Sequence, residues 1–286
     1  ADKTGVGVAL STAAVVSGAM FGDNLSIISD TTIAATRTQG CEMRDKFKTN
    51  FKIVMPAAIL TIIILIMMTK NAGMVEIDTL EYSFIKIVPY LAVIIAALCG
   101  LNVMIILTAG IVIAGIIGLA SGSFNIVGLC TSIASGAMGM SELIIISLMI
   151  AGTIAIIKEN GGIDFILNIG LKKFKNKRDA ELGIAALVSF VDICTANNTI
   201  AIVSTGPIAK DISDEFELEP KRVAGILDMF SCVFQGIIPH GAQLISAAGI
   251  ALVSPFEIMK FLFYPYLMGI CALISIFYYN RKRAAR

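Results

Sequence analysis

Long apolar stretches separated by short polar ones dominate the chain. Uninterrupted stretches occupy residues 53–69, 85–100, 101–120, 142–157 and 261–279. A helix of about 20 apolar residues crosses a bilayer, and several of these stretches approach that length. The pattern predicts a series of membrane-spanning helices, two of which are joined tightly at Gly100.

Three further apolar elements are interrupted by polar residues. They cover residues 5–36, 182–208 and 223–253, with polar stretches at 21–32, 192–199 and 235–241. Irregular backbone at membrane depth survives only where it is buried in protein or lines a wet cavity. Each interruption therefore predicts a discontinuous helix or a re-entrant hairpin. A soluble loop is expected at residues 211–222, between the last two elements.

Basic residues cluster at 37–52, 172–178 and 281–286, which we interpret as cytoplasmic loops. This topology makes either 182–208 or 223–253 a re-entrant hairpin. The first choice leaves two broken helices that cross in opposite directions, as in an inverted repeat. The sequence therefore predicts an all-α polytopic membrane protein, an inverted-repeat transporter with discontinuous helices and a re-entrant hairpin, as a single transport domain over residues 1–286.

Composition supports a membrane protein and argues against several other classes. Hydrophobic residues make up 57% of the chain and charged residues 15%, whereas soluble domains carry about 25% charged residues. A net charge of +1 gives no general attraction to nucleic acid. The six cysteines show no CxxC spacing, and Walker, GxSxG and HExxH motifs are absent. We expect no cofactor and no enzyme activity.

The sequence starts at Ala1 with no signal-peptide pattern and enters an apolar segment almost at once. We expect a fragment or a processed chain that lacks an upstream membrane-embedded part.

The stretch at residues 21–32 contains two carboxylates, Asp23 and Asp30. An Asp at the centre of a spanning helix costs about 2.5–3.5 kcal/mol, so such residues mark candidate functional sites. Carboxylate, hydroxyl, amide and backbone carbonyl oxygens are the ligands that hard cations prefer. The alternative is an ordinary loop in which Asp23 or Asp30, or the run starting at Ser29, caps the following helix.

The other two interruptions offer weaker candidates. The stretch at 192–199 is rich in oxygen ligands, although an ordinary turn would also explain it. Its candidates are Asp192, Thr195, Asn197, Asn198 and Thr199. The stretch at 235–241 and the helix before it supply Asp228, Gln235, Pro239 and His240. His240 is either a structural or solvated side chain or a proton-sensitive group near the cavity, because histidine titrates near physiological pH.

Residues 17–32 read SGAMFGDNLSIISDTT. This pattern resembles the NhaC-type sodium/proton antiporters of the ion transporter superfamily. The joint at Gly100, the turn at 195–199 and the break at 237–239 resemble that family more weakly. The sequence departs from the family pattern at Ile27, where many relatives have proline. It departs again at His240, where some relatives have a polar or aromatic residue.

The resemblance implies exchange of Na⁺ for H⁺ by alternating access in the cytoplasmic membrane of a prokaryote. It implies that Asp23 and Asp30 hold the cation and exchange it for protons. Oxygen ligands, or the shape of the break, would come from Asn24, Ser26, Ser29, Thr31 and Thr32. Asn197, Asn198 and Thr199 would form a facing hairpin tip. The partners implied are membrane lipid, Na⁺, H⁺, an N-terminal half of the same transporter and a second copy in a homodimer.

Two other hypotheses stay open at the level of sequence. Some members of the family carry organic anions or amino acids with the cation, so a sodium-coupled transporter of a small organic solute is the first alternative. The second is a membrane component that transports nothing, in which the polar interruptions are plain loops.

Overall fold

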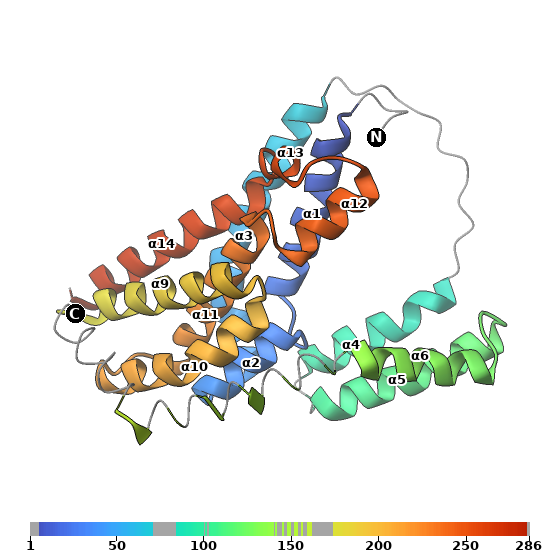
Figure 1. Cartoon of the computed structure of the whole chain (residues 1–286), viewed down its shortest axis with the longest axis horizontal. Helices are drawn as coiled ribbons and strands as arrows, with labels where there is room; N and C mark the ends of the chain where they lie inside the picture. Colours follow the sequence, from blue (N-terminus) through green and yellow to red (C-terminus); the bar gives the residue numbers. More distant parts are fainter. Residues whose placement is uncertain are drawn as a thin grey trace. The chain divides into compact units, whose positions relative to one another are not determined.

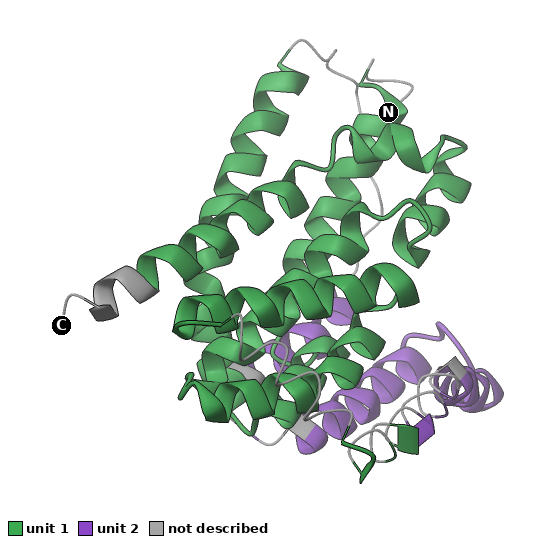
Figure 2. Ribbon diagram, turned by 60° about the vertical axis from the view of Figure 1, so that its left-hand side comes forward, with its two compact units in different colours: residues 1–75, 150–286 green, residues 76–149 purple. Residues whose placement is uncertain are grey.

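The computed structural model describes residues 6–70, 84–99, 101, 103–139 and 174–284, together with single positions between 141 and 161. Every regular element in these residues is a helix, which confirms the predicted all-α class. The chain forms two compact units, one of residues 1–75 and 150–286 and one of residues 76–149 (Figure 2).

The larger unit is built around one buried helix. Its helices are α1 (Val8–Asn24), α2 (Asp30–Gln39), α3 (Met43–Thr69), α9 (Lys177–Thr195), α10 (Asn198–Glu215), α11 (Pro220–Ile237), α12 (Ala242–Ala251), α13 (Pro255–Met259) and α14 (Phe263–Ala284) (Figure 1). Helix α11 packs against α2, α3, α9, α10 and α14. Nearly all of its side chains are buried, so any polar group on α11 must find its partners inside the protein.

The smaller unit contains a 3₁₀ turn, Phe84–Ile87, followed by α4 (Val88–Leu98), α5 (Val103–Ala120) and α6 (Ile126–Gly139). Helix α4 packs on α5. The Phe124 ring lies so close to Gly118 that a Cβ there would come within 2.1 Å of it. The predicted joint at Gly100 and most of the predicted span 142–157 lie outside the described residues.

Two helical stretches are long and apolar enough to cross a membrane, Met43–Thr69 and Pro220–Ala251. Shorter apolar helices lie at Phe84–Ala96, Met104–Ala120, Ile126–Met138 and Phe263–Tyr279. In α3 the apolar side chains are largely exposed, as Ile62 and Met67 show at 56% and 71%. An apolar surface of this kind suits contact with lipid.

The three predicted interruptions are all present as breaks between helices. Residues 25–29 separate α1 from α2, residues 196–197 separate α9 from α10, and residues 238–241 separate α11 from α12. The first break is shorter than the polar stretch, because helix continues through Asn24 and resumes at Asp30.

Two loop predictions were wrong. Residues 37–52 are mostly helical, because α2 ends only at Gly40, which adopts a left-handed conformation with φ +68°, and α3 starts at Met43. Residues 211–222 are also mostly helical, since α10 ends at Glu215 and Pro220 opens α11. The basic stretch 172–178 enters helix at Lys177, where the Asn176 side chain caps α9. Charged residues other than Asp are good helix formers, so charge alone does not predict a loop.

Candidate functional site

The break between α1 and α2 is closed by its own hydroxyl groups. The Ser26 hydroxyl accepts hydrogen bonds from the backbone N–H groups of Ile28 and Ser29, at 3.1 and 2.9 Å. Ser29 caps α2 by accepting from the Thr32 N–H at 3.3 Å. Capping by the run that starts at Ser29 is therefore confirmed, and the capping atom is the Ser29 hydroxyl rather than a carboxylate of Asp23 or Asp30.

The Thr32 hydroxyl links the break to helix α3. It donates to the Ser26 carbonyl at 2.9 Å and accepts from the Lys46 ammonium at 2.6 Å. Thr32 and Lys46 are both fully buried. Thr32 and Ser29 thus hold the break in shape, and their hydroxyls are already engaged with protein groups.

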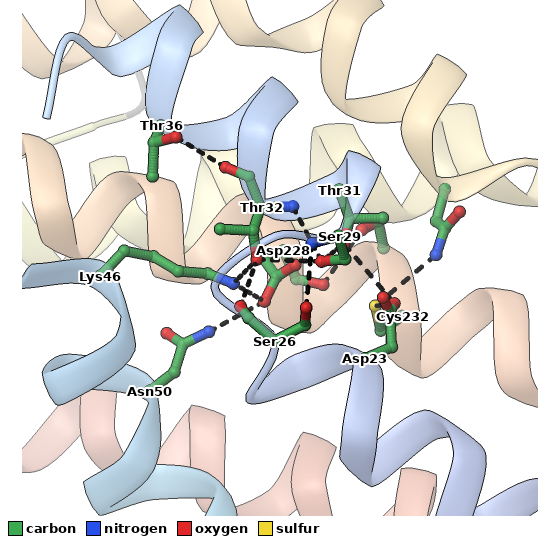
Figure 3. A network of polar contacts seen from close by, with 12 residues as sticks. Asp23, Ser26, Ser29, Thr31, Thr32, Thr36, Lys46, Asn50, Asp228 and Cys232 are labelled. Atoms are coloured by element: carbon green, nitrogen blue, oxygen red, sulfur yellow. Dashed lines mark hydrogen bonds and ion pairs between the residues drawn. The ribbon is translucent and has the colours of Figure 1, made fainter. Parts of the chain in front are cut away.

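Lys46 forms a buried ion pair with Asp228 on α11 (Figure 3). The Nζ–Oδ2 distance is 2.7 Å and neither side chain is exposed to solvent. Asn50, one turn along α3, donates to the same carboxylate oxygen at 2.8 Å. The other oxygen of Asp228 has no hydrogen-bond partner among the described residues. Asp228 is therefore neutralised inside the protein by a fixed cation.

Asp23 lies in the last turn of α1 and is held far more loosely. Its Oδ2 atom is 3.5 Å from both the Thr31 hydroxyl and the Cys232 thiol. The contact with the hydroxyl is at the outer limit of hydrogen bonding, whereas 3.5 Å is an ordinary distance for the thiol, which is a weak donor. Asp228 and Cys232 are four residues apart on α11, so they project from the same face of that helix. Asp23 therefore approaches the face of α11 that carries Asp228.

Asp23 lines a cavity of about 340 Å³. The other lining residues are Val15, Val16, Ala19, Met20, Asn198, Cys232, Gln235, Gly236 and Gln243. They come from α1, α10, α11 and α12, so the cavity lies between the first and third breaks and the α9–α10 tip. Asp23 is the sole carboxylate among the described residues that line it.

Asp30 is bound on both sides. The backbone N–H of Thr31 donates to its Oδ1 at 2.9 Å, and the Thr199 hydroxyl donates to its Oδ2 at 2.7 Å. The second bond joins α2 to the tip of the α9–α10 hairpin. The family resemblance implied that this tip faces the break, and the structure brings the two together through Thr199.

The hairpin tip is shaped by Ala196, a left-handed residue with φ +50°. Asn197 caps α10 by accepting from the Ile200 N–H at 3.0 Å. Asn198 contacts the Cys232 thiol at 3.7 Å and lines the cavity. The Thr195 hydroxyl bonds to the Val191 carbonyl of its own helix. The tip therefore contributes Asn198 to the cavity and Thr199 to Asp30.

Two predicted site residues are buried without partners. Asn24 and Asp192 are both fully buried. Neither the Asn24 amide atoms nor the Asp192 carboxylate oxygens have hydrogen-bond partners in the described chain. Such groups are rare in proteins, but neither side chain lines the cavity that Asp23 faces.

The third break divides into a cavity side and an exposed side. The Gln235 amide donates to the Ala196 carbonyl at 2.9 Å and to Gln243 at 2.6 Å, and Gln235 lines the cavity. His240 is exposed, and its Nε2 lies 3.0 Å from the Ile193 carbonyl. Pro239 and His240 are not part of the cavity wall.

Lys46 was missed by sequence reasoning, which treated it as one charge in a basic loop. A usable signal was present in its spacing. Polar and small residues recur along one face of α3, at Lys46, Asn50, Ala57 and Thr61, all buried. A lysine at the start of such a face points inward.

No cluster of three or more His, Cys, Asp or Glu in the described residues is placed to hold a metal ion.

Comparison with known proteins identifies the family of this chain. The sequence model of the Na⁺/H⁺ antiporter family matches residues 69–280, which is most of the chain. The chain belongs to the Na⁺/H⁺ antiporter family. This confirms the family that the resemblance implied. The match spans the second and third breaks, whereas the break between α1 and α2 precedes it.

Two curated relatives are similar over much of the chain. The malate-2H⁺/Na⁺-lactate antiporter of Bacillus subtilis is 22% identical over 295 residues, covering 91% of this chain and 62% of that protein. An uncharacterized protein of Haemophilus influenzae is 27% identical over 200 residues, covering 66% of this chain and 37% of its own length. The chain thus spans less than two thirds of either relative. No solved structure matches.

Proposed function

We propose that this chain carries the ion site of a secondary transporter that exchanges Na⁺ for H⁺ across a prokaryotic cytoplasmic membrane. Membership of the antiporter family supports the general class. The observation that carries the proposal is Asp23, a carboxylate that lines a cavity and whose hydrogen-bond partners among the described residues are the Thr31 hydroxyl and the weakly donating Cys232 thiol, each at 3.5 Å. Such a group can be neutralised by a cation or by a proton, and competition between the two gives exchange.

The neighbouring carboxylates are less available than Asp23. Lys46 supplies a permanent positive charge to Asp228 at 2.7 Å. Asp30 is engaged by the Thr31 N–H and the Thr199 hydroxyl. Hard cations take oxygen ligands, and the amides of Asn198 and Gln235 lie on the same cavity wall as Asp23. In this proposal Asp23 binds the ion, while Asp30 and Asp228 hold the surrounding elements in place.

The broken helices provide the means for alternating access. In transporters with discontinuous helices, the breaks form the ion site, and rocking of one element against another exposes it to each side. The cavity here is bounded by α1, α10, α11 and α12, each of which ends or begins at a break. An inverted relation between the α1–α2 and α11–α12 elements is part of the proposal.

Substitution of Asp23 tests the assignment. We expect Asp23→Asn to abolish sodium-driven proton movement in proteoliposomes, because an amide takes up no proton near neutral pH and has no negative charge to balance Na⁺. Asp30→Asn should reduce exchange without abolishing it. Asp214→Asn is a matched control, since Asp214 is 62% exposed and pairs only with Lys210 on the surface. Undiminished exchange in the Asp23 variant would overturn the proposal.

A sodium-coupled transporter of a small organic solute is the second candidate, and the cavity favours it. A volume of about 340 Å³ exceeds what a single ion needs, and the amides of Asn198, Gln235 and Gln243 could bond an organic group. One relative is named as a malate-2H⁺/Na⁺-lactate antiporter. No Lys or Arg occurs among the described lining residues, so a carboxylate solute would need the bound cation as its counter-ion.

Because a carboxylate solute would need bound Na⁺ as its counter-ion, transport assays can distinguish the organic-solute transporter from the Na⁺/H⁺ antiporter. If a carboxylate is carried, uptake of radiolabelled lactate or malate should be negligible without Na⁺ and restored by it. Gln243→Leu should then impair uptake but leave Na⁺ binding intact. Full Na⁺/H⁺ exchange in liposomes without any organic solute would instead favour the simple antiporter.

A further inference from the structure

A second cavity, of about 540 Å³, lies at the charged ends of α3, α11 and α14. It shares no lining residue with the cavity that Asp23 faces. Helices α3 and α11 both present their N-terminal ends here, and helix N-termini carry partial positive charge. Its wall is rich in basic side chains, of which Lys48, Lys52 and Lys221 are exposed.

The cations of this wall differ in how they are engaged. Arg222 is fixed: it pairs with Glu181, donates to the Ser275 carbonyl at 3.1 Å and stacks 4.1 Å above the Tyr279 ring. Lys221 lies 3.4 Å from Glu219. By contrast, Lys48 and Lys52 form no ion pair with any carboxylate in the described part of the chain.

The two unpaired lysines are four residues apart on α3, so they project from one face of the helix. They extend over a wall that also contains an Asp45 carboxylate near the helix start. Between the fixed Arg222 guanidinium and the two exposed ammonium groups there is room for an anion with several oxygens. Phosphate oxygens accept hydrogen bonds from lysine in this way.

The apolar surface beyond the cavity indicates where that phosphate comes from. About seven residues, or roughly 10 Å of helix, separate Lys52 from Ile59, where the exposed apolar face of α3 begins. Ile59 and Ile66 are 50% and 62% exposed, and on α14 Ile274 is 59% exposed. A free phosphate ion makes no favourable contact with such an apolar surface, whereas a phospholipid would place its acyl chains along it.

We propose that this cavity binds the phosphate headgroup of an anionic phospholipid, with Lys48, Lys52 and Lys221 as the donors. The site does not depend on the ion exchange proposed for Asp23. Basic residues near a membrane attract anionic headgroups in this manner. The arrangement assigns the charged ends of α3, α11 and α14 to one membrane interface.

Native mass spectrometry of the full chain in a neutral detergent can test this site. We expect dioleoylphosphatidylglycerol to bind in preference to dioleoylphosphatidylcholine. Lys48→Gln combined with Lys52→Gln should weaken phosphatidylglycerol binding about tenfold or more, because two headgroup contacts are lost. Phosphatidylcholine binding should not change. Lys48→Arg combined with Lys52→Arg should keep the preference.

The control is Lys177→Gln combined with Lys210→Gln, which removes the same charge from lysines outside the cavity. It should leave phosphatidylglycerol binding unchanged. Equal loss in both double variants would overturn the site, because net charge would then explain the effect. Equal binding of the two lipids would also overturn it. Displacement of the lipid by glycerol phosphate at matched concentration would identify free phosphate as the ligand and refute the lipid assignment.

Discussion

Two carboxylates lie at the same face of α11, Asp228 as one of its own side chains and Asp23 reaching it from α1, and they differ in almost every other respect. Asp228 is fully buried and its Oδ2 atom accepts from Lys46 and Asn50 at 2.7 and 2.8 Å. Asp23 reaches Cys232, one turn further along, at 3.5 Å and faces a cavity. The first carboxylate is dry and compensated by the protein, whereas the second is accessible and nearly unengaged.

Under the proposed function, this difference lets one helix break serve both stability and transport. A mobile ion needs a carboxylate that protein groups have not already neutralised. A break at membrane depth also needs a rigid anchor, because its free backbone groups must be satisfied. Lys46 provides that anchor by bonding Asp228 and the Thr32 hydroxyl together. The predictions below separate these two roles.

The largest expected effect on stability comes from breaking the ion pair between Lys46 and Asp228. Lys46→Met leaves the Asp228 charge buried without its partner, and breaking a buried pair in this way destabilises proteins by about 3–5 kcal/mol. We expect a large fall in the unfolding temperature of the detergent-solubilised protein, followed by circular dichroism. The break should also loosen, because Thr32 loses its contact with α3.

The double variant Lys46→Met/Asp228→Leu provides the control for this prediction. Replacing a whole buried pair by apolar residues of similar volume is often neutral or stabilising. We therefore expect it to recover most of the lost stability. A double variant as unstable as Lys46→Met alone would show that the pair has no special role.

A smaller effect is expected where Asp30 meets the hairpin tip. Thr199→Val removes a hydrogen bond of 2.7 Å to a carboxylate. Bonds to charged groups contribute about 1.5–3 kcal/mol, but Asp30 is exposed and water can replace the hydroxyl, so we expect a loss of about 1 kcal/mol. Denaturant unfolding measures it. Thr195→Val is the matched control, because that hydroxyl bonds only carbonyls of its own hairpin. Equal losses in the two variants would contradict a link between α2 and the tip.

Much of this arrangement could be predicted from the order of residues along the chain. Polar residues inside apolar stretches located all three breaks, because lipid cannot satisfy irregular backbone. The serine and threonine pattern also predicted the cap at Ser29. These features depend on neighbours in sequence, and local physical chemistry is sufficient to find them.

Features that depend on distant pairing were not predictable in the same way. Lys46 and Asp228 are 182 positions apart. The spacing of residues on α3 can place Lys46 on the inward face, unlike the exposed Lys48 and Lys52, but it does not identify Asp228 as its partner. The charges at 37–52 suggested a loop, yet most of that stretch is helix with one buried lysine. Asn24 was expected among the oxygen ligands, but whether its buried amide has a role depends on contacts that sequence does not specify.

For the accessible carboxylate, Asp23→Asn should abolish exchange while it changes stability little. Its contact with the Thr31 hydroxyl is long at 3.5 Å and the Cys232 thiol is a weak donor, and an amide keeps the shape of the carboxylate. We expect the free energy of unfolding to change by less than about 1 kcal/mol, while exchange is lost. The same preparation should be used for both measurements. A variant that unfolds as readily as Lys46→Met would mean that the loss of exchange is structural.

The smallest effect on stability is expected from a substitution at His240. This ring is exposed, contacts only the Ile193 carbonyl and lies outside the cavity wall. A glutamine amide can donate to the same carbonyl, so His240→Gln should change stability by less than about 0.5 kcal/mol, as surface substitutions usually do. If Asp23 alone receives the proton, the pH profile of exchange should be the same in this variant. A shifted profile would assign proton sensing to His240 and would extend the accessible region from Asp23 to the third break.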